Sequence, residues 1–156
     1  PKRDGVNGVL YSARPLVLNG NIVDGIRFEF ENGKIVKATA EKGEEVLNKA
    51  LDTDENSRFL GEIALVPYDS PISNSGITFF NTLFDENAAC HLAMGMGFAD
   101  TIDNFQDKTL EECRELGVND SMIHEDFMIG CDSMNIDAIC EDGKVVPIFR
   151  GGNWAF

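Results

Sequence analysis

Turn dipeptides that contain glycine constrain the fold more than any other feature of this sequence. Asn-Gly or Asp-Gly pairs recur between short runs rich in β-branched and aromatic residues in the first forty positions. Such pairs supply the positive φ angles that two-residue hairpin turns require. The clearest case is Asn32-Gly33, which lies between the apolar residues Phe30 and Ile35, and Asp142-Gly143 repeats the pattern near the end of the chain. We therefore expect antiparallel hairpins at both places.

The rest of the chain mixes helical and extended patterns, without an internal repeat or a low-complexity linker. Apolar residues at helical spacing predict helices over residues 41–51, 86–98 and 109–116. Short apolar runs predict strands over residues 59–67, 123–129, 136–140 and 145–149. These patterns predict an α/β fold with a mixed, largely antiparallel sheet and a few flanking helices. At 156 residues, the chain has the length of one domain, 1–156.

Two of the expected helices carry specific boundary signals. Thr109 and Glu112 have the spacing of a capping box, and Gly117 is placed to end that helix. Asp85 or a neighbouring residue is placed to cap the helix expected over residues 86–98. The boundaries of both helices are therefore predicted by side-chain chemistry as well as by apolar spacing.

The charge balance excludes two classes of partner. The chain has 13 basic and 27 acidic residues, which gives a net charge of −14. Nucleic acids and anionic membrane surfaces bind basic proteins, so we expect neither as a partner. No apolar run is long enough to span a membrane, and no signal-peptide pattern is present. Because the first residue is Pro1 and not Met, we expect the chain to be a piece of a longer protein.

The cysteines do not form a recognisable metal or disulfide motif. Cys90, Cys113, Cys131 and Cys140 show neither a CxxC pair nor the spacing of a zinc knuckle. Without a secretory signal, we expect reduced, buried thiols in a cytoplasmic protein. Metal ligation by these cysteines is the alternative.

One candidate metal-binding pair lies in an expected strand. His124 and Asp126 are separated by one residue, and side chains at positions i and i+2 of a strand point to the same face. An imidazole and a carboxylate side by side can bind a divalent cation. The alternative is a neutral histidine hydrogen-bonded to a surface aspartate.

A second candidate is a carboxylate inside an apolar run. Glu62 interrupts the strand expected over residues 59–67. A buried carboxylate is costly unless it is paired, protonated or bound to a metal. The alternative is that Glu62 lies at the exposed start of the strand.

The third candidate region contains the other histidine of the chain. His91 follows Glu86 by five residues, which on a continuous helix places the two side chains about 140° apart. They can share a metal only if Glu86 lies at or before the start of the helix. Phe98 follows His91 by seven residues and returns to the same face of that helix. The alternatives are a core or partner-facing histidine and a core phenylalanine.

Several stretches follow the order of one known family. They are residues 61–67, 70–73, 81–95, 124–130 and 152–154. With these stretches the chain resembles the thermophilic metallo-aminopeptidases of the aminopeptidase T, AmpS and PepS type over nearly its whole length. The Asp-Glu-Asn-x-x-x-His segment that ends at His91 is highly specific.

This resemblance implies a cytoplasmic, homodimeric exopeptidase that removes N-terminal amino acids from peptides with two divalent metal ions (zinc, cobalt or manganese). By position, Glu62 matches a metal-bridging glutamate, and His91 matches the histidine of the family's metal motif. Glu86 matches the acidic residue before it that belongs to the metal site, and it is also our candidate catalytic residue. His124 and Asp126 match a His-x-Asp pair of metal ligands.

The chain departs from the family pattern in two respects. The family commonly has tyrosine seven residues after this histidine, whereas Phe98 stands there and can neither ligate a metal nor donate a hydrogen bond. The family's first glutamate ligand lies in a Thr-Glu-Glu segment upstream of Pro1. We therefore expect that an N-terminal domain is absent, that this piece is inactive alone, and that the missing glutamates include the general base. Glu86 and Glu125 are the fallback candidates for that base.

Two other functions remain open from the sequence. The first is a catalytically lapsed module of the same fold that binds peptides or mediates dimerisation, which Phe98 and the missing ligand would explain. The second is an amidohydrolase that uses the same metals on substrates other than peptides.

Overall fold

A computed structural model describes residues 1–156 and contains eleven strands arranged in four small antiparallel sheets. The strands are β1 (Gly8–Tyr11), β2 (Leu16–Leu18), β3 (Asn21–Val23), β4 (Arg27–Glu31), β5 (Lys34–Thr39), β6 (Leu60–Ala64), β7 (His91–Gly95), β8 (His124–Met128), β9 (Ile136–Ile139), β10 (Val145–Arg150) and β11 (Asn153–Trp154). The helices are α1 (Glu44–Leu51), α2 (Pro71–Asn74), α3 (Thr82–Asp85) and α4 (Leu110–Glu115), with the 3-10 turns η1 (Glu86–Ala88), η2 (Ala99–Thr101) and η3 (Phe105–Asp107). The prediction of an α/β fold with largely antiparallel sheets and few helices is confirmed.

The expected turns form. Asn32 and Gly33 both have positive φ and join β4 to β5, while Gly143 has positive φ in the turn between β9 and β10. The capping box at α4 is also present, because Thr109 accepts a hydrogen bond from the Glu112 amide and the Glu112 carboxylate accepts one from the Thr109 amide. Local sequence therefore determines these features.

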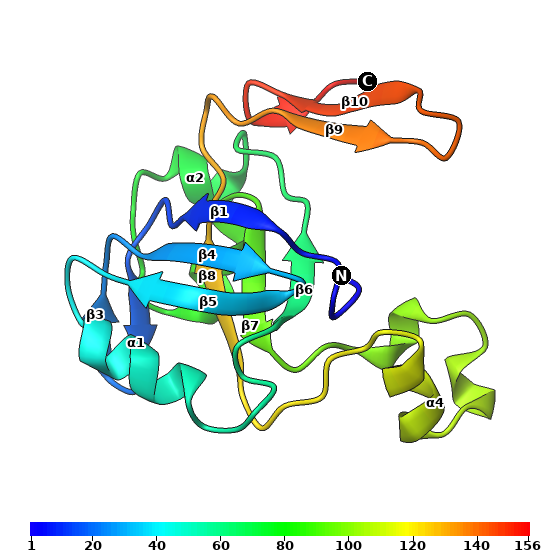
Figure 1. Cartoon of the computed structure of the whole chain (residues 1–156). Coiled ribbons are helices and arrows are strands. Elements are labelled where there is room, and N and C mark those ends of the chain that lie inside the picture. The colour runs from blue at the N-terminus through cyan, green and yellow to red at the C-terminus, as the bar shows by residue number, and fades with distance from the viewer.

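The hydrophobic core lies between two three-stranded sheets, β1-β4-β5 and β6-β7-β8, which overlap in Figure 1. Phe28 of β4 meets Phe127 of β8 edge to face, with ring centroids 5.3 Å apart. Leu92 and Met94 of β7 and Leu60 of β6 are buried in the same cluster. One face of the sheet β6-β7-β8 thus packs in the core. The alternate residues of these strands point away from the core, on the other face of the sheet.

The helix expected over residues 86–98 is wrong. Asn81, not Asp85, caps the short helix α3, and after η1 the chain becomes extended at Ala89. His91 therefore lies in β7, the central strand of the sheet, and every residue of β7 is buried. Alanine, leucine and methionine favour helices, but pairing with both β6 and β8 and burial of both faces outweigh that weak preference.

Two further segments of the chain lie outside this core. Figure 1 shows the segment containing η2, η3 and α4 on one side of the molecule, and the sheet β9-β10-β11 across the top. All four cysteines are free thiols, but only Cys90 and Cys113 are buried as expected, whereas Cys131 is half-buried and Cys140 is exposed. No helix has both the length and the apolar composition needed to cross a bilayer.

Candidate metal centre

The face of the sheet β6-β7-β8 that points away from the core carries the candidate ligands. Directly paired residues of antiparallel strands point to the same face. Glu62 of β6 pairs with Ala93 of β7, which in turn pairs with Asp126 of β8. Ala93 has the shortest side chain of this row, so the two carboxylates stand on either side of an open position. His91, two residues before Ala93, projects from the same face.

A β-bulge brings Glu62 to this face. Leu60 pairs with Met94 and Glu62 pairs with Ala93, so β6 has one residue more than β7 between these two pairs. The additional residue is Gly61. If Gly61 were instead paired regularly, without a bulge, Glu62 would lie on the core face with Leu60, because alternate residues of a regular strand share a face. The bulge therefore moves the carboxylate from the core to the side of His91 and Asp126.

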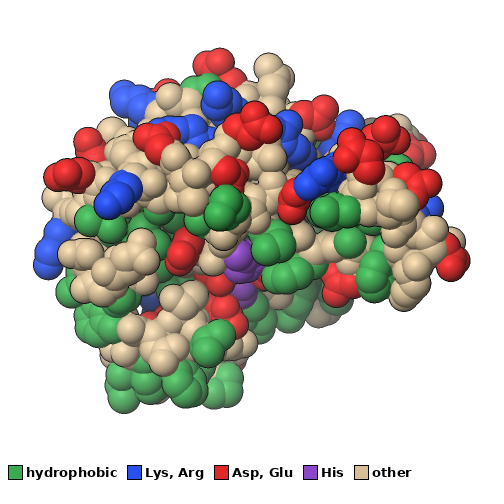
Figure 2. Space-filling view, turned by 90° about the horizontal axis from the view of Figure 1, so that it is seen from below, with side chains coloured by type: hydrophobic (Ala, Val, Ile, Leu, Met, Phe, Trp, Pro, Cys, Tyr) green, Lys and Arg blue, Asp and Glu red, His purple; other side chains and the backbone are tan.

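The ligand atoms of four side chains converge. Glu62 Oε1 lies 3.4 Å from His91 Nε2, and Glu62 Oε2 lies 3.6 Å from His124 Nε2. His124 Nε2 also lies 3.5 Å from Asp126 Oδ1. His91 and Asp126 are buried, and Glu62 and His124 are half-buried. Figure 2 shows the histidine side chains in a hollow of the surface, bordered by acidic and hydrophobic side chains.

Backbone carbonyls orient both imidazoles. His124 Nδ1 lies 2.7 Å from the Met96 carbonyl oxygen, and His91 Nδ1 lies 3.4 Å from the Ala89 carbonyl oxygen. A carbonyl oxygen can only accept, so each Nδ1 carries the proton. Each Nε2 then faces the carboxylates, and in the neutral imidazole its lone pair is free for a metal ion, as a metal-binding histidine requires.

The pKa of His124 is raised to about 9, chiefly by its hydrogen bond with Asp126 and also by the Met96 carbonyl, although partial burial opposes this rise. Without a metal ion, the imidazole is therefore a cation at neutral pH. An ion that binds Nε2 must displace that proton.

Glu86 lies beside this group on η1, immediately after α3. Its pKa is raised, first by burial and then by repulsion from Asp126 and Glu62. The turn before it is held by Asp85, whose buried carboxylate accepts hydrogen bonds from the Phe79 and Asn81 amides at 2.9 and 3.0 Å. Phe80, between these two residues, has a positive φ of 54°. Glu86 is thus presented from a tightly held turn.

Phe98 is next to the centre although it cannot be a ligand. Its ring centroid lies 4.9 Å from that of His124, with the two planes tilted by 53°. The ring packs on the imidazole and covers one side of it. The other fallback residue, Glu125, pairs with Met94 and so points to the opposite face from Asp126.

The residues present fit a divalent metal ion. One donor atom each from Glu62, His91 and Asp126 lie within 4.8 Å of one another. Imidazole nitrogen and carboxylate oxygen are suitable ligands for zinc, cobalt and manganese. The structure thus brings together Glu62, His91, Asp126 and His124, with Glu86 at their side. Sequence reasoning missed Gly61 and Ala93; a glycine inside a strand pattern was the available signal for the bulge.

Comparison with known proteins identifies the family of this chain. The profile described as "Thermophilic metalloprotease (M29)" matches residues 1–154. Aminopeptidase AmpS of Bacillus subtilis is 55% identical over all 156 residues, and aminopeptidase T of Thermus aquaticus is 50% identical over 154 residues. The solved structure of wild-type AmpT from Thermus thermophilus superposes on the whole chain with a TM-score of 0.91 at 48% identity.

The match covers only part of these relatives. The chain spans 38% of the length of AmpS and 38% of the solved AmpT chain. Within that span, the family match runs through all the strands that carry the clustered side chains. With this coverage and identity, the chain belongs to the family of thermophilic metalloproteases (M29).

Proposed function

We propose that this chain is the C-terminal, metal-binding part of a longer aminopeptidase that releases N-terminal amino acids from peptides. The relatives that it matches are named aminopeptidases, and the family is one of metalloproteases. The observation that carries the proposal is the position of Glu62 between two histidines. Its two carboxylate oxygens each face a different imidazole, His91 at 3.4 Å and His124 at 3.6 Å. That arrangement suits a carboxylate shared by two ions.

The proposed cofactors are two divalent ions, zinc, cobalt or manganese. Glu62, His91, His124 and Asp126 would hold them in this chain, with Glu86 as a further donor. When bound, such ions polarise the scissile carbonyl and lower the pKa of a water molecule. A further glutamate, expected by resemblance from the part of the protein that precedes this chain, would complete the centre.

The protein side chains contribute orientation and proton transfer. The Met96 and Ala89 carbonyls hold the two imidazoles with Nε2 toward the carboxylates. Glu86 is the candidate in this chain for holding a proton during the reaction, because burial and neighbouring carboxylates favour its protonated form. The glutamates expected upstream are the stronger candidates for the general base. The whole protein acts on peptides in the cytoplasm as a homodimer.

Chelation of the full-length protein should abolish peptidase activity. Removal of the ions leaves the clustered carboxylates and imidazoles without the Lewis acid that the reaction needs. Addition of zinc, cobalt or manganese should restore the activity, and calcium, which prefers sites of oxygen ligands alone, should not. The measurement is release of an N-terminal residue from a peptide, with elemental analysis before and after chelation. Activity that survives complete removal of the metal contradicts the proposal, and peptide binding without turnover would indicate a lapsed binding module.

Metal affinity should depend on pH because of His124. Since its pKa is about 9 in the metal-free protein, the imidazole is protonated throughout the neutral range. Each unit by which the pH falls below about 9 should then weaken binding about tenfold for the one proton displaced. Calorimetric titration in buffers of different ionisation enthalpy measures the protons released. Binding at pH 7 that releases no proton would show that the ion does not displace the proton of His124.

A further inference from the structure

The segment that follows β7 contacts the imidazole of His124 at two places. The Met96 carbonyl oxygen lies 2.7 Å from His124 Nδ1, and the centroid of the Phe98 ring lies 4.9 Å from that of the imidazole. Neither contact uses Nε2, the nitrogen that faces the carboxylates. The Met96 side chain is 38% exposed, so Met96 acts on His124 through its backbone carbonyl. The position of residues 96–98 therefore decides how His124 faces the other candidate ligands.

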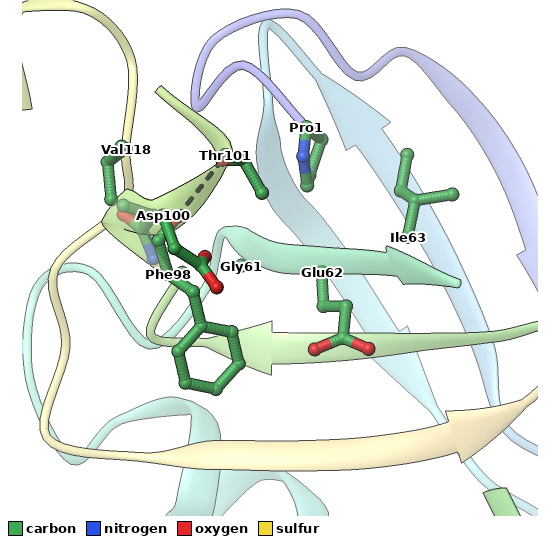
Figure 3. Close-up of a pocket in the computed structure, with 10 residues that line it drawn as sticks. Pro1, Gly61, Glu62, Ile63, Phe98, Asp100, Thr101 and Val118 are labelled. Carbon is green, nitrogen blue, oxygen red and sulfur yellow. Dashed lines mark hydrogen bonds between the residues drawn. The ribbon is translucent and has the colours of Figure 1, made fainter. Parts of the chain in front are cut away.

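This segment has little of its own to fix it. Gly95 and Gly97 flank Met96, and glycine is the residue with the most backbone freedom to lose on folding. Gly95 has a φ of 96°, a conformation that other residues rarely adopt. Figure 3 shows Gly61 and Phe98 close together where β6 begins and β7 ends. The segment must therefore be held by hydrogen bonds from other parts of the chain.

Asn119 supplies hydrogen bonds on both sides of Met96. The Asn119 side-chain amide donates to the Gly95 carbonyl at 2.6 Å. The backbone carbonyl of Asn119 accepts from the Gly97 amide at 2.8 Å. Asn119 is only 1% exposed, so water cannot readily replace it, and a buried polar group left without its partner is costly. A single buried residue thus bridges the residue before Met96 and the residue after it.

The orientation of the Asn119 amide follows from its third neighbour. Arg3 Nε lies 3.0 Å from Asn119 Oδ1, and a guanidinium can only donate. The amide nitrogen therefore points the other way, where its two protons go to the Gly95 carbonyl and to the Asn56 carbonyl, the latter at 2.9 Å. Both donors of the side chain are used. A residue of the same shape without these donors would leave two carbonyl oxygens unpaired.

We propose that Asn119 is a positioning residue of the metal centre. It is not a ligand, and it acts through the Met96 carbonyl and the Phe98 ring, the two groups that set the imidazole of His124. With residues 96–98 held in place, His124 Nε2 lies 3.6 Å from Glu62 Oε2, where one ion can reach both. This inference rests on the proposed function, in which His124 binds a metal ion.

The test is Asn119→Asp in the full-length protein. Aspartate has the same shape and still accepts from Arg3, which keeps it ionised, but it cannot donate to the Gly95 and Asn56 carbonyls. Affinity for cobalt should fall about tenfold, the lower end of the range of about 10–100-fold for outer partners of a ligand, because Asn119 acts through an intervening carbonyl. The visible absorption spectrum of the cobalt-loaded protein should also change, because it reports the geometry of the ligands around the ion.

The matched control is Asn56→Asp, the same substitution in the same hydrogen-bond network. The Asn56 side chain accepts from Arg3 Nη2 at 2.6 Å and donates to the Asp120 carbonyl at 2.8 Å, without a bond to residues 95–98. This variant should keep its cobalt spectrum and a metal affinity within about twofold of the wild-type value. Thermal unfolding of both variants shows that each is folded. If Asn119→Asp does not fold, Asn119→Ser, which leaves room for water beside the two carbonyls, is measured in its place.

Two outcomes overturn the inference. One is a folded Asn119 variant with the wild-type affinity and cobalt spectrum, and the other is an equal loss of affinity in Asn56→Asp. If the wild-type protein binds no metal, the proposed function fails, and positioning is then judged on the metal-free protein. The Nδ1 proton of His124, identified in NMR spectra by its absence in His124→Gln, should be protected from exchange in the wild type and in Asn56→Asp but not in Asn119→Asp. Equal protection in all three also contradicts the inference.

Discussion

Replacing Asp126 with asparagine is expected to abolish turnover by the full-length protein and to reduce its affinity for the metal at least about 100-fold, since loss of even an outer partner of a ligand costs about 10–100-fold. Asp126 is buried and lies across Ala93 from Glu62. Asparagine preserves the volume but removes the negative charge. It also removes the main cause of the raised pKa of His124, so less than one proton should be released when metal binds at pH 7.

The adjacent residue of the same strand supplies the control for this variant. Glu125 pairs with Met94 and points away from the face that carries Asp126. Glu125→Gln removes a carboxylate of the same charge, one position away, and should leave metal affinity within about twofold. Metal titration and thermal unfolding of both variants separate a loss of ligand from a loss of fold. Equal metal affinity of Asp126→Asn and the wild-type protein would remove Asp126 from the ligand set.

Substitution of Gly61 with alanine should damage both stability and metal binding, although Gly61 carries no functional group. A Cβ at this position would lie 1.9 Å from the Met96 carbonyl oxygen. β6 must then separate from the end of β7, and we expect a loss of at least about 2 kcal/mol in the free energy of unfolding. Because the bulge at Gly61 turns Glu62 toward the histidines, metal affinity should fall together with stability.

Denaturant unfolding with and without metal measures both effects of Gly61→Ala. The control is Gly5→Ala, because a Cβ at Gly5 comes no closer than 3.3 Å to any neighbour, and it should change stability by less than about 0.5 kcal/mol. If the Gly61 variant unfolds at the same denaturant concentration as the wild-type protein and binds metal equally well, the bulge does not position Glu62.

The features that the sequence predicted correctly are those with short-range causes. Asn32-Gly33 forms its hairpin because the turn needs residues that tolerate positive φ. The capping box of α4 forms between residues three apart. The α/β fold and the family also followed from the chain alone, because the motif around His91 is specific and the 55% identity to AmpS extends over the whole chain.

The segment around His91 shows where sequence reasoning failed. Its alanine, leucine and methionine residues favour a helix, and residues 86–98 were expected to form one. The segment is instead the central strand of a sheet whose two neighbours lie far away in the sequence, at Leu60–Ala64 and His124–Met128. The pairing of β7 with β6 and β8 is a long-range effect, which the helix or strand propensities of the local residues do not predict. The Gly95-x-Gly97 pattern at its end was the available sign that a long helix would not continue.

The sequence by itself determined which residues are chemically capable of binding a metal: two histidines and a few carboxylates in otherwise apolar segments. Only the tertiary structure decided which of them meet. Glu62 reaches the two histidines through a one-residue bulge, Asp126 and Glu125 fall on opposite faces of one strand, and Ala93 leaves the position between the carboxylates open. These outcomes depend on strand register. A shift of one residue moves every side chain of a strand to the other face of the sheet. The register is set by the pairing of strands that are distant in the sequence, and local sequence patterns do not contain that information.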